Sequence, residues 1–240
     1  MTETYMMTIP RSVSKRAIRI MLDKNDCKKW IVGKEVGKNG YEHWQVRLQT
    51  SNKSFFDWVK LHIGTAHVEK AQDQWIYERK EGCFWTSDDN TDVLRLRFGR
   101  PTKAQNAVIQ AVRATNDREV VVWYDPKGNQ GKSWLCGHLW ETGKAHYVPP
   151  TLTSVKEMIQ TVASLMMTER REIIVIDIPR SWKWSKELYT AIETIKDGLI
   201  MDCRYSARTI NVRGIKVLIM TNTKPALDAL SADRWIFYSP

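Results

Sequence analysis

The stretch from residue 120 to residue 133 constrains the fold more than any other part of the chain. It begins with the apolar run Val120–Tyr124, continues into a turn with two glycines, and ends on Lys132 and Ser133, after which the sequence suits a helix. Glycines let successive backbone N–H groups turn toward one anion, and a helix N-terminus adds positive potential. A strand, such a loop and a helix in this order predict a phosphate-binding loop.

The side chains of the loop indicate a nucleoside triphosphate with its metal ion. Lys132 can reach the β- and γ-phosphates, and the Ser133 hydroxyl can hold Mg²⁺. The sequence departs from the usual pattern G-x-x-x-x-G-K-[ST] at its first position, which is Pro126. A surface turn with an incidental Gly-Lys-Ser is the alternative. The residues expected to bind ATP with Mg²⁺ are Gly128, Asn129, Gln130, Gly131, Lys132 and Ser133.

The sequence around this loop alternates between strand and helix, which predicts a parallel α/β domain. The expected strands are 119–124, 172–178 and 215–221, and the expected helices are 103–114, 132–140, 153–168 and 185–197.

The first part of the chain has a different pattern, because short strands joined by hairpins are interspersed with helices. This pattern predicts an α+β domain with an antiparallel sheet. A boundary at Gly99–Thr102 gives two domains, 1–100 and 101–240. The expected strands of the first domain are 5–10, 30–36 and 43–49, with a strand or turn at 64–69, and the expected helices are 14–22, 53–62 and 73–80.

Both parts of the chain are basic. The formal net charge is +10, and residues 1–100 hold 18 basic and 13 acidic side chains while residues 101–240 hold 19 and 14. A basic globular chain favours a polyanionic partner such as nucleic acid, although a merely soluble basic protein is the alternative.

The cysteines and the apolar runs narrow the class of protein. The four cysteines lie far apart without a C-x-x-C pair, which argues against a zinc module or a disulfide framework and for a reducing compartment. The sequence shows no signal-peptide apolar region and no run of membrane-spanning length. We therefore expect a soluble intracellular protein with no membrane partner.

Three side chains of the first domain suit a divalent cation. His43 and Gln45 are two residues apart on an expected strand, so both project from one face, and Glu35 lies on the preceding strand across a tight turn. An imidazole, an amide oxygen and a carboxylate can together hold Mg²⁺ or Mn²⁺. Glu42 is a rival for the carboxylate ligand, but its place next to His43 should turn it to the opposite face. The alternative is that His43 is an ordinary half-buried strand residue.

A tyrosine and a lysine of the expected helix 73–80 suit nucleophilic chemistry. Tyr77 and Lys80 are three residues apart and therefore lie on one helical face. A tyrosine hydroxyl near a divalent cation and a lysine is a plausible nucleophile, and the cation would polarise a scissile phosphate. A solvated amphipathic helix is the alternative.

The order of these motifs resembles that of a known family. Tyr5–Pro10, His43-Trp44-Gln45, Tyr77–Lys80 and the phosphate-binding loop follow one another as in the replication initiator proteins of circular single-stranded DNA viruses. These proteins join a rolling-circle endonuclease to a superfamily 3 helicase. In its short length and in the segment Lys80–Trp85, the chain most resembles smacovirus proteins or nanovirus- or alphasatellite-like relatives. The resemblance spans almost the whole chain.

The resemblance implies a function for each domain. Tyr77 would attack viral single-stranded DNA at a stem-loop origin, which gives a 5′-phosphotyrosine link and a free 3′-OH. The second domain would be an AAA+-like helicase that assembles as a ring, expected to be a hexamer. Host replication machinery is an implied partner, in the host nucleus if the host is eukaryotic and in the host cytoplasm otherwise. The implied metal ligands are Glu35, His43 and Gln45, with Lys80 supporting the tyrosine or the phosphate.

Two further strands of the second domain end in polar residues. The strand before Asp177 follows a phosphate-binding loop, so this carboxylate is expected to hold the water shell of Mg²⁺. The family often has a second acid after it, whereas this chain has Ile178-Pro179-Arg180, so the base that activates water is not identified. By the resemblance, Asn222 after Val217–Thr221 would orient the attacking water.

Basic residues of the second domain are candidates for contact with DNA or with a neighbouring subunit. Arg234 lies beyond the Asn222 motif and is a candidate arginine finger. The alternative for Arg234 is a surface ion pair. The alternative for the other basic residues is a solvated basic hairpin. The residues where the family places its DNA-contacting hairpin are Lys196, Arg204, Arg208 and Arg213.

Two other classes of function fit parts of this pattern. A non-catalytic single-strand-binding regulator could use the loop as a nucleotide switch, and it would form no covalent product with DNA. A small-molecule kinase could use the same loop, but residues 1–100 give no support for it.

Overall fold

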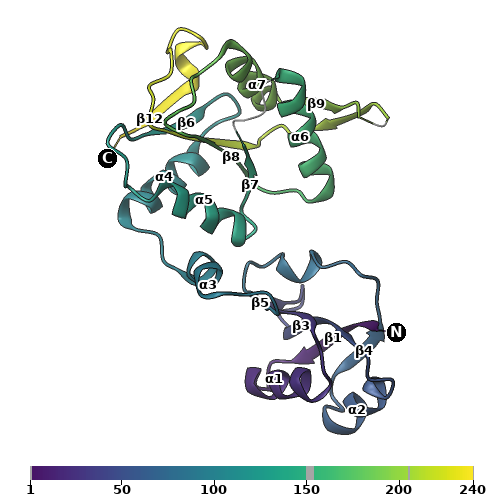
Figure 1. Ribbon diagram of the computed structural model, residues 1–240. Coiled ribbons are helices and arrows are strands. Elements are labelled where there is room, and N and C mark those ends of the chain that lie inside the picture. Colours follow the sequence, from purple (N-terminus) through teal and green to yellow (C-terminus); the bar gives the residue numbers. More distant parts are fainter. Residues whose placement is uncertain (1, 150–153, 205, 240) are drawn as a thin grey trace. The chain divides into compact units, whose positions relative to one another are not determined.

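The computed structural model of the chain describes residues 2–149, 154–204 and 206–239 (Figure 1). It divides into two compact units, Met1–Phe98 and Gly99–Pro240, so the division falls two residues before the expected one. Each unit has its own sheet and its own hydrophobic core. In the described part of the chain, no helix is long and apolar enough to cross a membrane.

The first unit is built on a five-stranded antiparallel sheet with the strand order β4-β1-β3-β2-β5. The long strand β3 lies between β1 and β2. The hairpin that joins β2 to β3 turns through Gly40, whose φ of +76° suits glycine. The strands are β1 (Glu3–Pro10), β2 (Lys29–Val36), β3 (Glu42–Thr50), β4 (His67–Lys70) and β5 (Phe84–Thr86).

Two helices cover one face of this sheet (Figure 1). α1 (Lys15–Lys24) begins at Ser14, whose hydroxyl oxygen accepts a hydrogen bond from an N–H of the first turn. α2 (Phe55–His62) follows β3, and Met21 of α1 and Phe55 of α2 are buried against the strands. Successive strand residues point to opposite faces, so the remaining strand side chains lie on the face away from these helices.

The face away from α1 and α2 carries the segment that contains Tyr77. The expected helix at 73–80 is wrong, because only Tyr77–Arg79 forms a turn of 3-10 helix, η1. A tertiary contact holds the segment in this conformation, because Arg47 of β3 binds the segment at two points. A 3-10 helix has three residues per turn, so Tyr77 and Lys80 still lie on one side.

A helix ends the first unit where no element was expected. α3 (Thr91–Phe98) carries Arg97, which donates hydrogen bonds to both carboxylate oxygens of Asp89 and to the Phe84 carbonyl oxygen. Because Arg97 and Asp89 are nearly buried, this pair ties the helix to the end of β5.

The second unit contains a five-stranded parallel sheet with the order β12-β6-β11-β8-β7. The strand before the phosphate-binding loop is β6, and β11 lies between it and β8. The carboxyl ends of these parallel strands meet at one edge, which is where open α/β sheets bind their ligands. The strands are β6 (Val120–Tyr124), β7 (Ala145–Val148), β8 (Ile173–Ile178), β11 (Lys216–Thr221) and β12 (Trp235–Tyr238).

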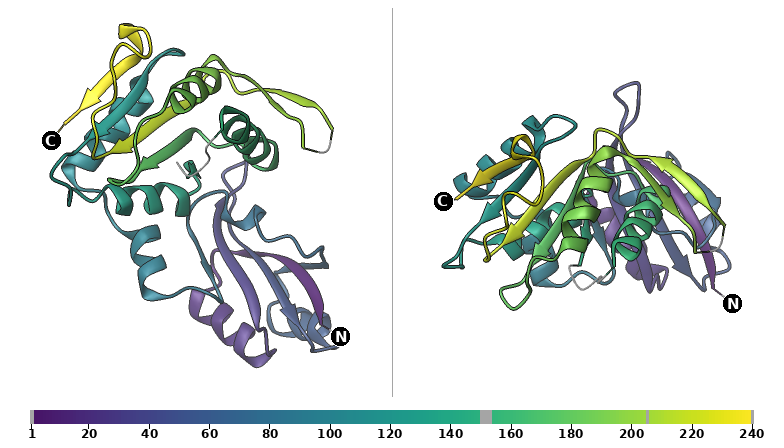
Figure 2. Two further views of the ribbon diagram at one scale, coloured as in Figure 1. Left: turned by 45° about the horizontal axis from the view of Figure 1, so that its top comes forward. Right: turned by 90° about the horizontal axis from the view of Figure 1, so that it is seen from above.

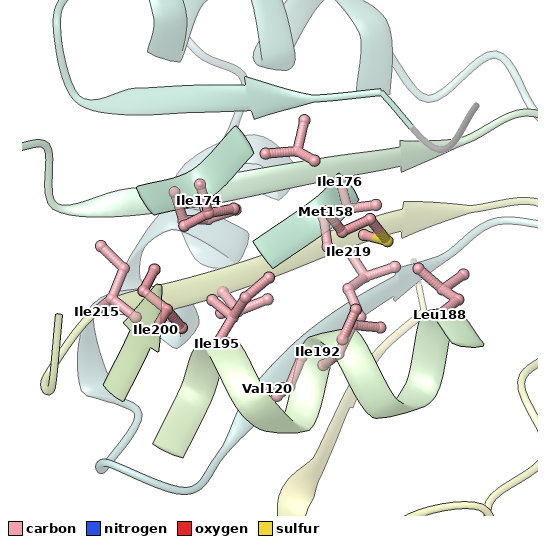
Figure 3. Packing of buried hydrophobic residues seen from close by; sticks show 14 of the residues in the cluster. Val120, Met158, Ile174, Ile176, Leu188, Ile192, Ile195, Ile200, Ile215 and Ile219 are labelled. Carbon is pink, nitrogen blue, oxygen red and sulfur yellow. The ribbon is translucent and has the colours of Figure 1, made fainter. Parts of the chain in front are cut away.

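Helices cover both faces of the parallel sheet. α4 (Lys103–Ala114) and α5 (Lys132–Glu141) pack on one face, and α6 (Val155–Thr168) and α7 (Lys186–Asp197) pack on the other. Figure 3 shows the core that α6 and α7 form with the strands. Burial on both faces explains why these strands are continuous apolar runs rather than alternating ones.

A two-stranded hairpin extends beyond the parallel sheet (Figure 2). It pairs β9 (Leu199–Asp202) with β10 (Arg208–Asn211) and follows Gly198, which ends α7 with a φ of +91°. The resemblance predicted a hairpin in this region, whereas the strands β7 and β12 were not expected. The expected helix 153–168 begins at residue 153, which lies outside the described residues.

Candidate functional site

The polar face of the first sheet brings a carboxylate and an imidazole together. Glu35 and His43 are direct partners in the pairing of β2 with β3, so their side chains share a face. His43 Nε2 lies 3.7 Å from Glu35 Oε2, and His43 Nδ1 lies 3.1 Å from the Tyr41 carbonyl oxygen. If Nδ1–H donates to that carbonyl, Nε2 keeps its lone pair on the side of Glu35.

Lys80 connects this pair to the tyrosine. Its Nζ lies 2.8 Å from Glu35 Oε2 and 3.8 Å from the centre of the Tyr77 ring. Partial burial acts to lower the pKa of Lys80, but the bonds with Glu35 and Tyr77 outweigh burial and raise the pKa above its ordinary value. Tyr77 is 53% exposed, so a large substrate can reach it. The structure thus gathers four of the expected site residues into one cluster.

Gln45, the third expected metal ligand, lies on the same face of β3 as His43. Its Oε1 accepts a hydrogen bond from Thr8 Oγ1 at 3.1 Å. A carbonyl-type oxygen has a second lone pair, so this bond leaves room for a metal contact. Glu42, the rival ligand, is exposed and pairs with Val36 on the other face of the strands.

The donor set of this face fits a small hard cation. In the described ranges no group of three His, Cys, Asp or Glu side chains could hold a metal ion, so the expected set depends on the amide of Gln45. Glu35 Oε1 is buried and has no hydrogen-bond partner. Burying an unpaired carboxylate oxygen is unfavourable, and a bound cation would satisfy it. Glu35, His43 and Gln45 therefore suit Mg²⁺ or Mn²⁺.

A buried ion pair that the sequence did not indicate holds the Tyr77 segment on the sheet. Arg47 Nε donates to Glu78 Oε1 at 2.9 Å, and Arg47 Nη1 donates to the Gln72 carbonyl oxygen at 2.7 Å. Burial raises the pKa of Glu78, although Arg47 acts against this. One guanidinium therefore fixes two points of the segment. The only sequence signal was that Arg47 falls on the same strand face as the expected metal ligands.

Gly33 lets this segment lie close to β2. A Cβ at this position would overlap the carbonyl oxygen of Glu78, which belongs to η1. Gly33 is also the direct pairing partner of Gln45 in β3. The absence of a side chain at residue 33 therefore sets how closely η1, and Tyr77 with it, approaches the sheet.

The phosphate-binding loop of the second unit has the backbone shape that its glycines predict. Gly128, Asn129 and Gly131 have φ values of +82°, +69° and +78°. Such left-handed residues turn neighbouring N–H groups toward a common centre, which suits an anion. α5 begins directly after Gly131, with Lys132 as its first residue and Ser133 exposed.

Lys132 is paired with a carboxylate at the start of the loop. Its Nζ lies 2.8 Å from Asp125 Oδ2, and the Gly128 N–H donates to Asp125 Oδ1 at 2.8 Å. Burial acts to raise the pKa of Asp125, but Lys132 and the N–H groups of Gly128 and Gln130 hold the pKa below its ordinary value. The ion pair of Lys132 with Asp125 therefore connects the end of the loop to its start.

The other two expected motor residues lie at the same edge of the sheet. Asp177 is near the end of β8, and burial raises the pKa of its carboxyl group while Lys132 acts against this. Asn222 follows β11, and its Nδ2 donates to the Asp125 carbonyl oxygen at 2.5 Å. Because β11 lies between β6 and β8, the structure brings these residues to the edge that carries the loop.

Comparisons with known proteins find similar viral replication proteins. No protein-family model matches the chain. It is 26% identical over 168 residues to the Master replication protein of Subterranean clover stunt virus (strain F), covering 64% of this chain and 55% of that protein. It is 26% identical over 196 residues to the Master replication protein of Banana bunchy top virus, covering 76% of this chain and 63% of that protein.

An alphasatellite protein gives a further match. The Para-Rep C6 of Subterranean clover stunt C6 alphasatellite is 29% identical over 135 residues, covering 54% of this chain and 44% of that protein. The chain is similar to nanovirus and alphasatellite replication proteins. This confirms the resemblance inferred from the motifs. The chain matches between about half and two thirds of the length of the two Master replication proteins.

One residue expected to contact DNA is buried and faces the inside of its unit. Lys196 is 1% exposed, and its Nζ donates to the carbonyl oxygens of Asn116 and Ile215. Burial lowers the pKa of Lys196 to about 8, with a further contribution from Lys216. Its position in the last turn of α7 suggested an exposed cation, but the side chain points inward and satisfies buried carbonyl groups.

The expected arginine finger is also wrong. Arg234 is 4% exposed, and its Nη2 lies 2.9 Å from Asp197 and 3.3 Å from Glu193 of the same chain. A finger must be free to reach a nucleotide on a neighbouring subunit, and a buried, paired guanidinium is not. Arg234 instead connects the C-terminal region to α7.

The remaining cations expected to contact DNA are exposed. Arg204, Arg208 and Arg213 lie in or next to the β9–β10 hairpin, and Arg204 also pairs with Asp202 at 2.7 Å. Because these side chains are exposed, the backbone of a DNA strand could reach them. Their expected role in contacting DNA stays a prediction.

Gln105 of α4 is a loop-positioning residue that the sequence analysis missed. Its Nε2 donates to the Gly131 carbonyl oxygen at 3.0 Å, and its Oε1 accepts from the Thr102 N–H at 2.8 Å. Thr102 and Gln105 form a capping box at the start of α4. The spacing Thr-x-x-Gln was visible in the sequence, but nothing there linked it to the loop.

Proposed function

We propose that this chain is a viral rolling-circle replication initiator that nicks and joins single-stranded DNA and uses ATP to unwind duplex DNA. The observation that carries the proposal is the cluster on the polar face of the first sheet. An exposed tyrosine, a lysine, a buried carboxylate with an unpaired oxygen and an imidazole lie together there. The similarity to proteins named Master replication protein supports the same conclusion.

The nicking step is a transesterification at phosphorus. Tyr77 Oη bonds to the scissile phosphorus, the bond from phosphorus to the 3′ oxygen breaks, and that oxygen takes up a proton as the phenol loses one. The products are a 5′-phosphotyrosine link and a free 3′-OH, and the reverse step joins a strand. Lys80 stays protonated near Tyr77, because the pKa of Lys80 is raised, and its charge stabilises the phenolate and the phosphate.

Glu35, His43 and Gln45 would hold the divalent cation, Mg²⁺ or Mn²⁺, of this reaction. A bound cation there would polarise the scissile phosphate. Glu35 has a second task, since it also binds Lys80 and so sets the distance between the cation site and the tyrosine.

The second unit would be the motor. Lys132 would leave Asp125 to bind the β- and γ-phosphates of ATP, Ser133 and Asp177 would hold Mg²⁺, and Asn222 would orient water. We further propose a hexameric ring, contact with DNA through the β9–β10 hairpin, and host replication proteins as partners. The stem-loop origin and the host compartment, nuclear in a eukaryote, belong to the same proposal.

The test of the nuclease detects a covalent product. A pool of hairpin oligonucleotides with randomised loops, labelled at the 3′ end, is incubated with the full chain and Mn²⁺. Denaturing electrophoresis should show a labelled protein band for the unmodified chain and none for Tyr77→Phe. Tyr147→Phe is the matched control, since Tyr147 is also exposed, at 41%, and lies in the other unit.

Two outcomes would contradict the proposed role of Tyr77 or the nuclease itself. An undiminished labelled band with Tyr77→Phe would exclude this tyrosine as the nucleophile. The absence of any band with the unmodified chain, together with DNA binding and negligible ATP turnover, would favour the single-strand-binding regulator.

A further inference from the structure

An arginine next to the phosphate-binding loop has no role in the function proposed so far. Arg180 follows the end of β8, three residues after Asp177, and its side chain is exposed. Its Nη2 donates a hydrogen bond to the Lys127 carbonyl oxygen at 3.1 Å. In the part of the chain that the structure describes, Arg180 has no carboxylate partner.

Arg180 and Asn222 converge on the same point of the loop. A Cβ at Gly128 would lie 3.0 Å from Arg180 Nη2 and 3.7 Å from Asn222 Nδ2. β8 is separated from β6 by β11, so the guanidinium reaches across the end of β11 to arrive there. An amide and a guanidinium from two different strands thus face the left-handed turn whose N–H groups suit a phosphate.

The contact that Arg180 now makes is one that a phosphate would replace. A guanidinium binds a neutral carbonyl oxygen less strongly than an anionic phosphate oxygen, and its planar donors match phosphate geometry. Because Arg180 is exposed and free of a carboxylate, it can change partners without leaving a buried charge unpaired. Lys132, in contrast, must first separate from Asp125.

An arginine at the transferring group, in addition to the lysine and the metal ion, accelerates phosphoryl transfer, and the arginine expected to supply this contact is unsuitable. Arg234 is buried and paired with Asp197 of its own chain. We propose that Arg180 is the catalytic arginine of the motor and that it contacts the γ-phosphate of the nucleotide bound by its own chain. This inference rests on the proposed ATP hydrolysis.

The role of Arg180 in the step is electrostatic. Water oxygen bonds to the γ-phosphorus, the bond to the oxygen that bridges the β- and γ-phosphates breaks and leaves its electron pair on ADP, and the proton that the water loses passes to the inorganic phosphate or to solvent. Arg180 keeps its proton and stabilises the charge on the γ-phosphate oxygens in the transition state. Asn222, beside it, remains the residue that orients the water.

The test compares Arg180→Ala and Arg180→Lys in the full chain. With Arg180→Ala, kcat for ATP hydrolysis should fall about 100-fold or more while KM and the binding of a fluorescent ATP analogue change less than about threefold. Arg180→Lys should recover only part of the rate, because an ammonium lacks the planar donors. Arg113→Ala is the matched control, since this exposed arginine pairs with Glu172 instead of the loop.

A mixing experiment separates action within one chain from action on a neighbour. Equal amounts of Arg180→Ala and Lys132→Ala should stay as inactive as the separate variants, because each active site lacks one of its own groups. Recovery of activity on mixing would show that Arg180 acts on a neighbouring subunit and would overturn the proposal.

Other outcomes also decide the matter. An unchanged kcat in Arg180→Ala, or loss of nucleotide binding together with kcat, would overturn the catalytic role. If the unmodified chain binds the analogue but does not hydrolyse ATP, the motor itself fails, and this result does not depend on any Arg180 variant.

Discussion

Each unit pairs a lysine with a buried carboxylate at the same distance, yet the two pairs are in different states. Lys80 Nζ lies 2.8 Å from Glu35, and Lys132 Nζ lies 2.8 Å from Asp125. The Lys80 side chain is 38% exposed, whereas that of Lys132 is 8% exposed. The first lysine is therefore accessible to a substrate as it stands, and the second is enclosed by its own loop.

The carboxylates differ more than the lysines. Asp125 uses both oxygens, one for Lys132 and one for the Gly128 N–H. Glu35 shares Oε2 between Lys80 and His43 and leaves Oε1 buried without a partner. The first carboxylate therefore keeps an oxygen that could accept the proposed cation, whereas the proposed binding of phosphate by Lys132 requires its existing pair with Asp125 to separate.

The largest effect is expected from removing the ion pair that supports the first site. Arg47→Met leaves Glu78 buried without its partner and should lower the free energy of unfolding by about 3–5 kcal/mol, measured by urea denaturation. The exposed pair of Arg95 and Asp92 gives the control, and Arg95→Met should change stability by less than about 0.5 kcal/mol. The double variant with Glu78→Met should be more stable than Arg47→Met, and a less stable double variant would contradict this account.

Replacing Lys132 or Lys80 by alanine, each in its own variant, should separate the proposed ATP hydrolysis from the proposed nicking. Lys132→Ala should lower kcat for ATP hydrolysis by about 100-fold or more and leave nicking intact, because the lysine stabilises only phosphates in the loop. Lys80→Ala should do the reverse. Steady-state hydrolysis and adduct formation measured on the same preparations decide this, and loss of both activities in one folded variant would contradict two separable sites.

Neutralising one carboxylate should sharpen the metal assignment. Glu35→Gln should weaken the apparent Mn²⁺ affinity of the nicking reaction by about 10- to 100-fold, because it removes the charged ligand. Electron paramagnetic resonance of bound Mn²⁺ gives a readout independent of activity. Glu42→Gln is the control on the opposite face of the strand, and an equal loss in that variant would assign the metal to Glu42.

A buried lysine without a carboxylate should give the smallest effect, and it depends on pH. The pKa of Lys196 is lowered to about 8, so between that pH and the unfolded pKa of about 10.4 the unfolded state binds more protons. Stability should therefore rise with pH in this window, by at most about 1 kcal/mol from pH 8 to 9. Lys196→Met should remove this slope, and an unchanged slope would contradict it.

Local patterns in the sequence predicted most of the elements that carry the sites. Alternation placed His43 and Gln45 on one face, and apolar runs that lead to Asp177 and Asn222 indicated a parallel sheet. These predictions worked because strand periodicity and edge position are set by neighbouring residues. The phosphate-binding loop was likewise indicated by residues within one short stretch.

Contacts between distant residues were not predictable in the same way. The pair of Arg47 and Glu78 spans 31 positions and replaced an expected helix with η1. Lys196 and Arg234 looked like exposed cations, but both side chains are buried and bind groups elsewhere in the chain, Asn116 and Asp197 among others. Sequence spacing gives no information on which cation turns inward, since that depends on carbonyl or carboxylate groups brought near by the fold.

Gly33 offers a way to move Tyr77 without changing any side chain of the proposed nuclease site. Because η1 rests against this residue, a side chain at position 33 should lift the segment that carries Tyr77 and Lys80, while Glu35, His43 and Gln45 keep their places on the strands. A series from glycine to alanine to serine would thus act as a spacer of graded thickness beneath the nucleophile. Such a series would measure how the height of the tyrosine above the sheet affects the proposed cutting and rejoining of DNA, through a residue that has no side chain of its own.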